Sequence, residues 1–149
     1  MDLQIKEGTP QDIPALLGLI KELALYEKAP EQVINTEAKM LEDGFGKQPI
    51  FKFWLAWDND IAVGMALVYF RYSTWKGKCL YLEDLYIKDE YRKHKLGHQF
   101  FDILKEYGKQ ENCQRISWQV LEWNEPAINF YKKIGASLDP EWTNGFMEL

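Results

Sequence analysis

A basic segment stands directly before an amphipathic stretch in the second half of the chain. It reads Arg92-Lys93-His94-Lys95-Leu96-Gly97, and helical spacing over about residues 97–110 follows, with an apolar face of Phe100, Phe101, Leu104 and Tyr107. A helix N-terminus offers unpaired N–H groups and a partial positive charge, so a loop with three fixed cationic side chains before it suits phosphate groups. The same composition is equally typical of a solvated loop before a surface helix. The residues alone leave both interpretations open.

Cysteine and histidine are too few to suggest a disulfide framework or a metal site. The cysteines are Cys79 and Cys113, and the histidines are His94 and His98, four residues apart. A secreted domain stapled by disulfides carries more cysteine, and the histidine pair has no third ligand beside it. We expect no metal.

The composition is that of one ordinary globular domain. The chain has 149 residues, of which 46% are hydrophobic and 15% aromatic, and its formal net charge of -5 argues against a nucleic-acid partner. Met1 to Gly8 lacks the basic and apolar regions of a signal peptide, and the longest apolar run, residues 61–70, is too short to span a membrane. We expect one domain over residues 1–149, in the cytoplasm, without a membrane partner.

Periodicity in the first half of the chain predicts one strand, two helices and then three strands. Leu3 and Ile5 indicate a short strand, and Thr9-Pro10 is typical of the start of a helix that ends near Tyr26. Thr36 begins a short helix that we expect Gly44 to stop. Three further strands are predicted, at residues 51–57, 61–72 and 79–87.

The second half predicts a helix at residues 97–110, a strand at 115–121, a helix capped by Asn124 that reaches Gly135, and a last strand at 142–149. Strand-helix-strand crossovers of this kind place neighbouring strands parallel. The element order therefore predicts one mixed α/β domain.

Residues 80–101, which hold a strand, the basic loop and a helix, resemble the acetyl-CoA site of the GNAT superfamily of N-acetyltransferases. Further blocks resemble the diamine (spermidine/spermine) acetyltransferases and stand in that family's order: Ile20-Lys21-Glu22-Leu23-Ala24, Leu41-Glu42-Asp43-Gly44-Phe45-Gly46, Leu80-Tyr81-Leu82-Glu83-Asp84, Glu122-Trp123-Asn124-Glu125-Pro126 and Ile128-Asn129-Phe130-Tyr131-Lys132. The resemblance implies a GNAT-like domain with a central mixed, mostly antiparallel sheet flanked by helices. It also implies acetyl-CoA as co-substrate, a small amine substrate and a homodimer.

The resemblance also implies which residues hold acetyl-CoA. The backbone of Leu85, Tyr86 and Ile87 would pair with the pantetheine arm, and the loop Arg92, Lys93, His94, Lys95, Leu96, Gly97 and His98 would hold the phosphates. Asn124, Glu125, Pro126, Ala127 and Tyr131 would line the same groove. One departure stands out, because Lys95 occupies a position where the family has glycine, which lets the backbone approach the pyrophosphate.

Two residues take catalytic roles by the same resemblance. Tyr131 would act as the general acid, since a phenol stays protonated at neutral pH and can deliver a proton to the CoA thiolate; the bare sequence favours a core tyrosine beside Phe130. Glu83 would act as the base through a water molecule. It ends an apolar run, so partial burial would raise its pKa, although a solvated carboxylate at a strand end is the alternative. In a regular strand Asp84 would point to the opposite face.

The resemblance places substrate contacts at Tyr26, Glu27, Glu83, Ser117, Trp118, Gln119 and Glu141. Spaced carboxylates and apolar walls suit a long cation, so we expect a polyamine-like or thialysine-like amine. Glu27 as a surface residue and Trp118 as a core residue remain equally open.

Two other functions fit the sequence. One is an N-acetyltransferase acting on a protein or peptide, and the other is an acyl-CoA-binding sensor without turnover, which the unusual Lys95 would suit.

Overall fold

Five strands form one sheet in the computed structural model, which describes all of residues 1–149. They lie in sequence order as β1 (Leu3–Glu7), β2 (Lys52–Asp58), β3 (Ile61–Ser73), β4 (Gly77–Ile87) and β5 (Ile116–Ser117). The first four strands pair antiparallel and the β4–β5 pair is parallel. The mixed, mostly antiparallel sheet that the family resemblance implies is confirmed.

The structure has four α-helices, α1 (Ile13–Tyr26), α2 (Glu37–Phe45), α3 (Leu96–Gln110) and α4 (Glu125–Lys133), and side chains cap the starts of α2 and α4. Thr36 Oγ1 accepts from the N–H of Lys39 at the start of α2, at 3.2 Å. The expectation that Gly44 stops α2 is wrong, since the helix runs to Phe45 and Gly46 follows it. Gly44 instead allows close packing, because a Cβ there would lie 2.6 Å from the Phe51 ring.

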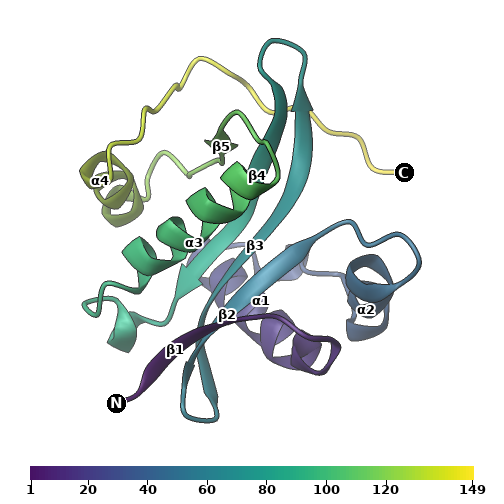
Figure 1. Cartoon of the computed structure of the whole chain (residues 1–149), viewed down its shortest axis with the longest axis vertical. Coiled ribbons are helices and arrows are strands. Elements are labelled where there is room, and N and C mark those ends of the chain that lie inside the picture. The colour runs from purple at the N-terminus through teal and green to yellow at the C-terminus, as the bar shows by residue number, and fades with distance from the viewer. The chain divides into compact units, whose positions relative to one another are not determined.

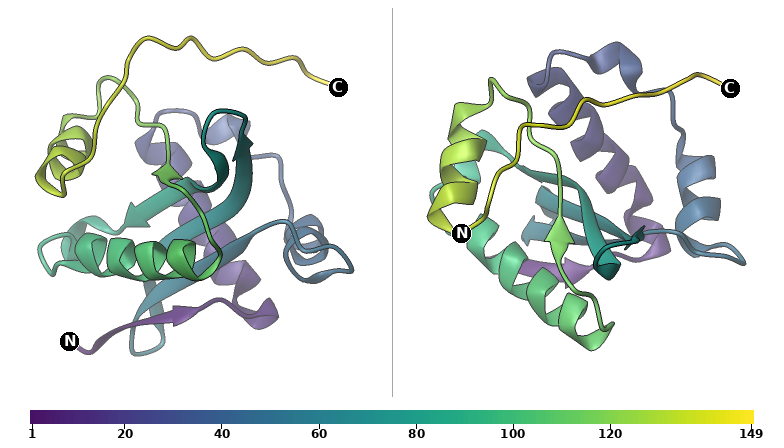
Figure 2. Two further views of the ribbon diagram at one scale, coloured as in Figure 1. Left: turned by 45° about the horizontal axis from the view of Figure 1, so that its top comes forward. Right: turned by 90° about the horizontal axis from the view of Figure 1, so that it is seen from above.

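One face of the sheet is covered by α1. Leu16 and Leu19 of α1 form a buried cluster with Phe53, Leu55 and Met65, which project from the same face of β2 and β3. Figures 1 and 2 show α1 along this face and α3 on the other side of the sheet. The face beneath α1 matters for the site, because the end of α1 lies over it.

The opposite face carries α3. Side chains alternate along a strand, so Trp54 points away from α1, and its ring meets Tyr107 of α3 edge-on at 5.4 Å. The ring of Trp118, just after β5, meets Phe101 of α3 in the same way at 5.2 Å. The helices therefore flank the sheet on both faces.

The chain divides into two units, Met1–Trp118 and Gln119–Leu149. The second unit contains α4, capped by Asn124, whose Oδ1 accepts from the N–H of Ala127 at 3.3 Å. The predicted strand at 115–121 shrinks to Ile116–Ser117, and the predicted strand at 142–149 is wrong, because those residues pair with no strand. A strand needs a partner ladder, which local sequence pattern does not supply. No helix combines the length and apolar character that a membrane span requires.

Candidate active site

A β-bulge at Glu83 interrupts the ladder between β3 and β4. Leu67 lies opposite Asp84 and Val68 lies opposite Leu82, so Glu83 is the extra residue on β4. A bulge leaves its extra residue outside the regular pairing and turns side chains to new directions. It is the only break in this ten-pair register.

The bulge brings two carboxylates to one face of the sheet. Residues opposite each other on antiparallel strands share a face, so Asp84 lies on the face of Leu67, beneath α1. Glu83 lies on that face too, since its Oε1 accepts from the Tyr69 hydroxyl at 3.2 Å. The expectation that Asp84 points to the opposite face is therefore wrong, because it assumed a regular strand.

Asp84 is a carboxyl group whose pKa is strongly raised by its surroundings. Burial, followed by the negative charges of Glu83 and Glu27, raises the pKa of Asp84 to about 7. Burial also raises the pKa of Glu27, which caps the end of α1. Glu83 itself is exposed, so the expectation that it is partly buried is wrong. Asp84 is the partly buried carboxyl group. Glu83 and Glu27 thus lie close enough to influence Asp84, and the combined negative charge of the three groups favours a bound cation.

Two tyrosines stand between this region and the tip of the β3–β4 hairpin. Tyr69 and Tyr81 are opposite each other, with ring centroids 5.2 Å apart. Burial and the nearby Glu83 raise the pKa of Tyr69 to about 12, and burial raises the pKa of Tyr81 as well. Both hydroxyls therefore stay protonated and can donate hydrogen bonds at any physiological pH.

The far edge of β4 has no strand partner over most of its length. β5 pairs with β4 only at Leu80↔Ile116 and Tyr81↔Ser117, so no strand lies beside residues 82–87 on that side. Leu85, Tyr86 and Ile87 belong to this open edge. Exposed strand N–H and C=O groups can pair with another extended chain that carries amides, which the pantetheine arm of CoA does.

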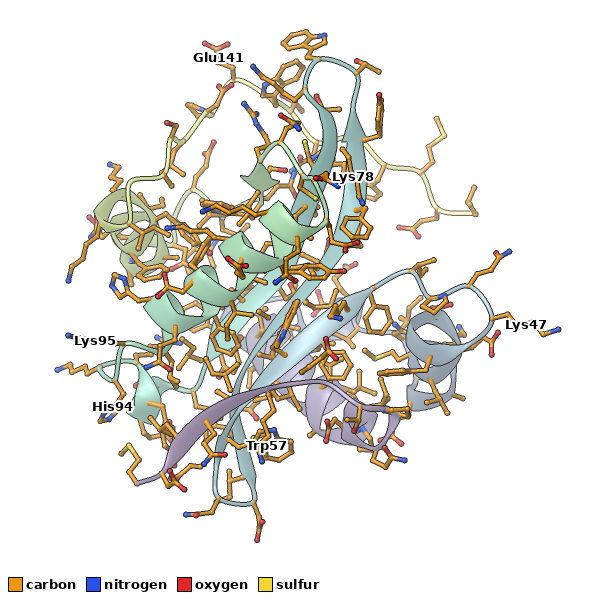
Figure 3. All side chains as sticks on the ribbon, viewed as in Figure 1. Lys47, Trp57, Lys78, His94, Lys95 and Glu141 are labelled. Atoms are coloured by element: carbon orange, nitrogen blue, oxygen red, sulfur yellow. The ribbon has the colours of Figure 1, made fainter.

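The basic loop leads into a helix N-terminus that no side chain caps. Lys95 adopts the left-handed conformation at φ 62° and ψ 18°, the region that favours the glycine seen in the family. Lys95 and His94 lie at the turn before α3, and the Lys95 side chain points away from the ribbon (Figure 3). Leu96 and Gly97 are buried beneath this turn. The uncapped N–H groups of a fifteen-residue helix remain suited to an anion.

Side chains anchor the loop to the rest of the first unit. Tyr91 donates to Asp58 Oδ2 at 2.8 Å, and Arg92 Nε donates to the carbonyl of Ile87 at 3.1 Å. The Arg92 guanidinium also lies 5.1 Å from the centroid of the Tyr26 ring. Arg92 therefore connects the basic loop with the end of β4 and the end of α1.

The remaining candidate residues occupy different surroundings. Ser117 of β5 pairs with Tyr81 of β4, whereas Trp118 packs against Phe101, as a core residue would.

Gln119 and Glu141 belong to the second unit, where the Gln119 amide donates to Asn144 Oδ1 at 2.6 Å. The second unit also holds the helix start Asn124, Glu125, Pro126 and Ala127, and Tyr131, whose ring centroid is 5.6 Å from that of Phe130. Figure 3 shows Glu141 on the extended tail.

Sequence reasoning missed Asp84, Tyr69 and Tyr81. Asp84 was visible as a charge after an apolar run, but the bulge that turns it toward α1 depends on pairing with β3. Tyr69 and Tyr81 lie in strongly apolar strands, where a tyrosine is ordinarily a core residue.

Comparison with known families settles the class of the protein. The model of the GNAT acetyltransferase family matches residues 18–136. The chain belongs to this family. It is an acetyl-CoA-dependent amine N-acetyltransferase with a GNAT fold, a five-stranded mixed sheet flanked by helices.

Over the aligned residues, two curated relatives are slightly more than one-third identical to this GNAT chain. A thialysine N-epsilon-acetyltransferase of Bos taurus is 37% identical over 142 residues, covering 90% of this chain and 84% of its own. The spermidine/spermine N(1)-acetyltransferase-like protein 1 of Homo sapiens is 36% identical, covering 89% of this chain and 20% of its own. Among solved structures, an integron cassette protein of V. cholerae is 26% identical with a TM-score of 0.79, covering 99% of this chain and 93% of its own.

Proposed function

We propose that this enzyme transfers the acetyl group of acetyl-CoA to the primary amine of a small polyamine-like or thialysine-like substrate. The observation that carries the proposal is the pair of carboxylates that the β4 bulge turns to the face beneath α1, with Glu27 close enough to influence Asp84. Three acidic groups beside aromatic walls suit a small cation, and not a neutral or anionic acceptor. The relatives named for thialysine and for spermidine and spermine support the same class of amine.

The first unit offers two features that fit acetyl-CoA. The open edge of β4 at Leu85, Tyr86 and Ile87 can pair with the amide-bearing arm, and the uncapped start of α3 can hold the phosphates with Arg92, Lys93, His94, Lys95, Leu96, Gly97 and His98. Asn124, Glu125, Pro126 and Ala127 of the second unit are further proposed contacts of acetyl-CoA. Bound there, acetyl-CoA supplies an acyl thioester that an amine can attack.

The amine must lose a proton before it attacks. We assign this step to Glu83, which accepts the proton through a water molecule, and to Asp84, whose pKa of about 7 allows its deprotonated form to accept that proton near neutral pH. The bulge also leaves a backbone N–H outside the ladder, and such a group can stabilise the negative charge that develops on the carbonyl oxygen.

The leaving thiolate needs a proton donor. We assign this role to Tyr131 of α4, because a phenol is an ordinary proton donor in proteins. Tyr26, Glu27, Ser117, Trp118, Gln119 and Glu141 remain proposed contacts of the amine.

We further propose that both units form one transferase domain over residues 1–149 and that the enzyme works as a cytoplasmic homodimer. The family model supports the first point because it runs across the boundary at Trp118. Light scattering on the purified chain, with and without acetyl-CoA, tests the homodimer, and a mass of one chain would refute it.

The direct test measures CoA thiol release from acetyl-CoA with spermidine, spermine, putrescine, thialysine, lysine and a lysine peptide. We expect release with at least one small amine, and its loss in Tyr131→Phe. Release with the peptide alone would favour a protein N-acetyltransferase. Calorimetric binding of acetyl-CoA without release for any amine would favour a sensor.

A further inference from the structure

An arginine stands at the outer end of the aromatic and acidic surface. Arg71 lies in β3, its side chain is exposed, and its guanidinium carbon is 5.1 Å from the centroid of the Tyr81 ring. Stacking over a ring holds a guanidinium in place without using its hydrogen-bond donors. The Tyr81 ring in turn touches Tyr69, the donor to Glu83. Arg71 is therefore connected to the carboxylates through two tyrosines.

The register puts Arg71 on the same face as both carboxylates. Arg71 and Tyr69 are two residues apart on β3 and share a face, while Asp84 lies opposite Leu67, two residues before Tyr69. At about 3.3 Å per residue, the four steps from Leu67 to Arg71 span roughly 13 Å. Arg71 thus lies at one end of this strip and Asp84 at the other, and Glu83 lies between them beside Tyr69.

The Arg71 guanidinium has no carboxylate partner within the chain. The acids of the ion pairs in the structure are Glu7, Glu111, Glu22 and Asp89, and none of them pairs with Arg71. The fork of donors on Arg71 suits a carboxylate in two-point contact. Its donors are therefore available to a carboxylate from another molecule.

We propose that Arg71 determines substrate specificity by binding the α-carboxylate of an ω-amino acid whose terminal amine lies at Glu83 and Asp84. The inference rests on the proposed function and narrows its substrate class. Six bonds separate the carboxyl carbon of lysine from its terminal nitrogen, a reach of roughly 7 Å, and the side chains of Arg71 and the acids cover the rest of the strip. A diamine of equal length would instead bring its second ammonium to Arg71, where like charges repel.

Matched substrates that differ only in the carboxylate test this assignment: lysine against cadaverine, and ornithine against putrescine. In whichever pair the wild-type enzyme acetylates faster, we expect a higher kcat/KM for the amino acid than for the diamine. Arg71→Gln should lower kcat/KM for the amino acid by about 10–100-fold, chiefly through KM, because a hydrogen bond to a charged group is lost. The same change should raise kcat/KM for the diamine, and Arg71→Glu should raise it further. Arg71→Lys should restore part of the amino-acid activity.

Lys76→Gln is the matched control, because Lys76 is an exposed cation on the turn of the same hairpin. It should leave both substrates unaffected, and equal unfolding midpoints would show that the variants are folded. A parallel loss for both substrates in Arg71→Gln, or no change in their ratio, would overturn the role of Arg71 while the proposed function stood. A wild-type enzyme that acetylates no small amine would refute the proposed function and this inference together.

Discussion

Asp84 lies opposite Leu67 in the β3–β4 ladder because Glu83, the residue between Asp84 and Leu82, is left out of the pairing. This one-residue shift puts adjacent carboxylates on the same face of a strand, where regular alternation would separate them. It also explains why burial reaches Asp84 and leaves Glu83 exposed.

Replacing Asp84 by asparagine should change how the rate depends on pH. Asp84, with a pKa of about 7, must lose its proton to act as a base, so kcat/KM of the wild type should rise through that pH. In Asp84→Asn we expect this rise to disappear and the rate at pH 8 to fall by about 10²–10³-fold. A pH series of CoA thiol release measures both. Asp60→Asn, at the β2–β3 turn, is the control.

The same substitution should stabilise the protein at alkaline pH. The pKa of Asp84 is higher in the folded state than its ordinary 3.8, so the folded chain binds more protons and this group's contribution to stability falls as pH rises from about 4 to 7. Asp84→Asn removes that cost. We expect its Tm to exceed the wild-type value at pH 8 and the difference to vanish near pH 4. A constant difference at every pH would contradict this account.

Tyr131→Phe should lower kcat by about 10²–10⁴-fold, because the proton donor is removed while the ring is kept. Steady-state thiol release with the preferred amine gives the value. Tyr72→Phe is the control, because Tyr72 is 75% exposed on the β3–β4 hairpin. Near-normal turnover in Tyr131→Phe would remove this residue from the mechanism.

Lys95→Gly should raise the free energy of unfolding by about 1 kcal/mol. A side chain in the left-handed conformation costs about 1–2 kcal/mol, and glycine avoids that cost but loses more backbone entropy on folding. Urea denaturation measures the change. Lys93→Gly should bring no gain, because Lys93 is not among the residues with positive φ. If Lys95→Gly destabilised the chain, its side chain would have to contribute contacts that outweigh the strain.

Asn124→Ala should reduce the free energy of unfolding by about 1 kcal/mol, because Asn124 Oδ1 accepts from the Ala127 N–H at the start of α4. Asn124→Asp keeps an acceptor at that position and should retain most of the stability. Comparing the Kd for acetyl-CoA in both variants then separates capping from cofactor binding. Equal stability in all three proteins would rule out the cap.

Local patterns were enough to predict most of the elements. The capping residues Thr9, Thr36 and Asn124 marked helix starts within a few residues, and alternating or continuous apolar runs marked the four long strands. The family blocks identified the acetyltransferase class. These features depend on neighbours in sequence, which a single sequence displays directly.

Features that depend on pairing could not be predicted. The bulge at Glu83 follows from how β4 fits β3, so the face of Asp84 and its burial were invisible. The left-handed conformation of Lys95 could not be predicted, because lysine rarely adopts it. Residues 142–149 have a strand-like sequence pattern, but they pair with no strand of the sheet. The surroundings of Arg71 likewise depend on Tyr81, which comes from the neighbouring strand.

The unpartnered edge of β4 has a consequence for handling the enzyme. Backbone amides at residues 82–87 that meet no strand should exchange their hydrogens with solvent more readily than those facing β3, and a bound cofactor arm should slow them. The same edge is a template on which extended segments of other molecules can assemble. Purified enzyme should therefore aggregate more slowly in storage when acetyl-CoA or CoA is present. The rate of aggregation then indicates whether the edge of β4 is covered.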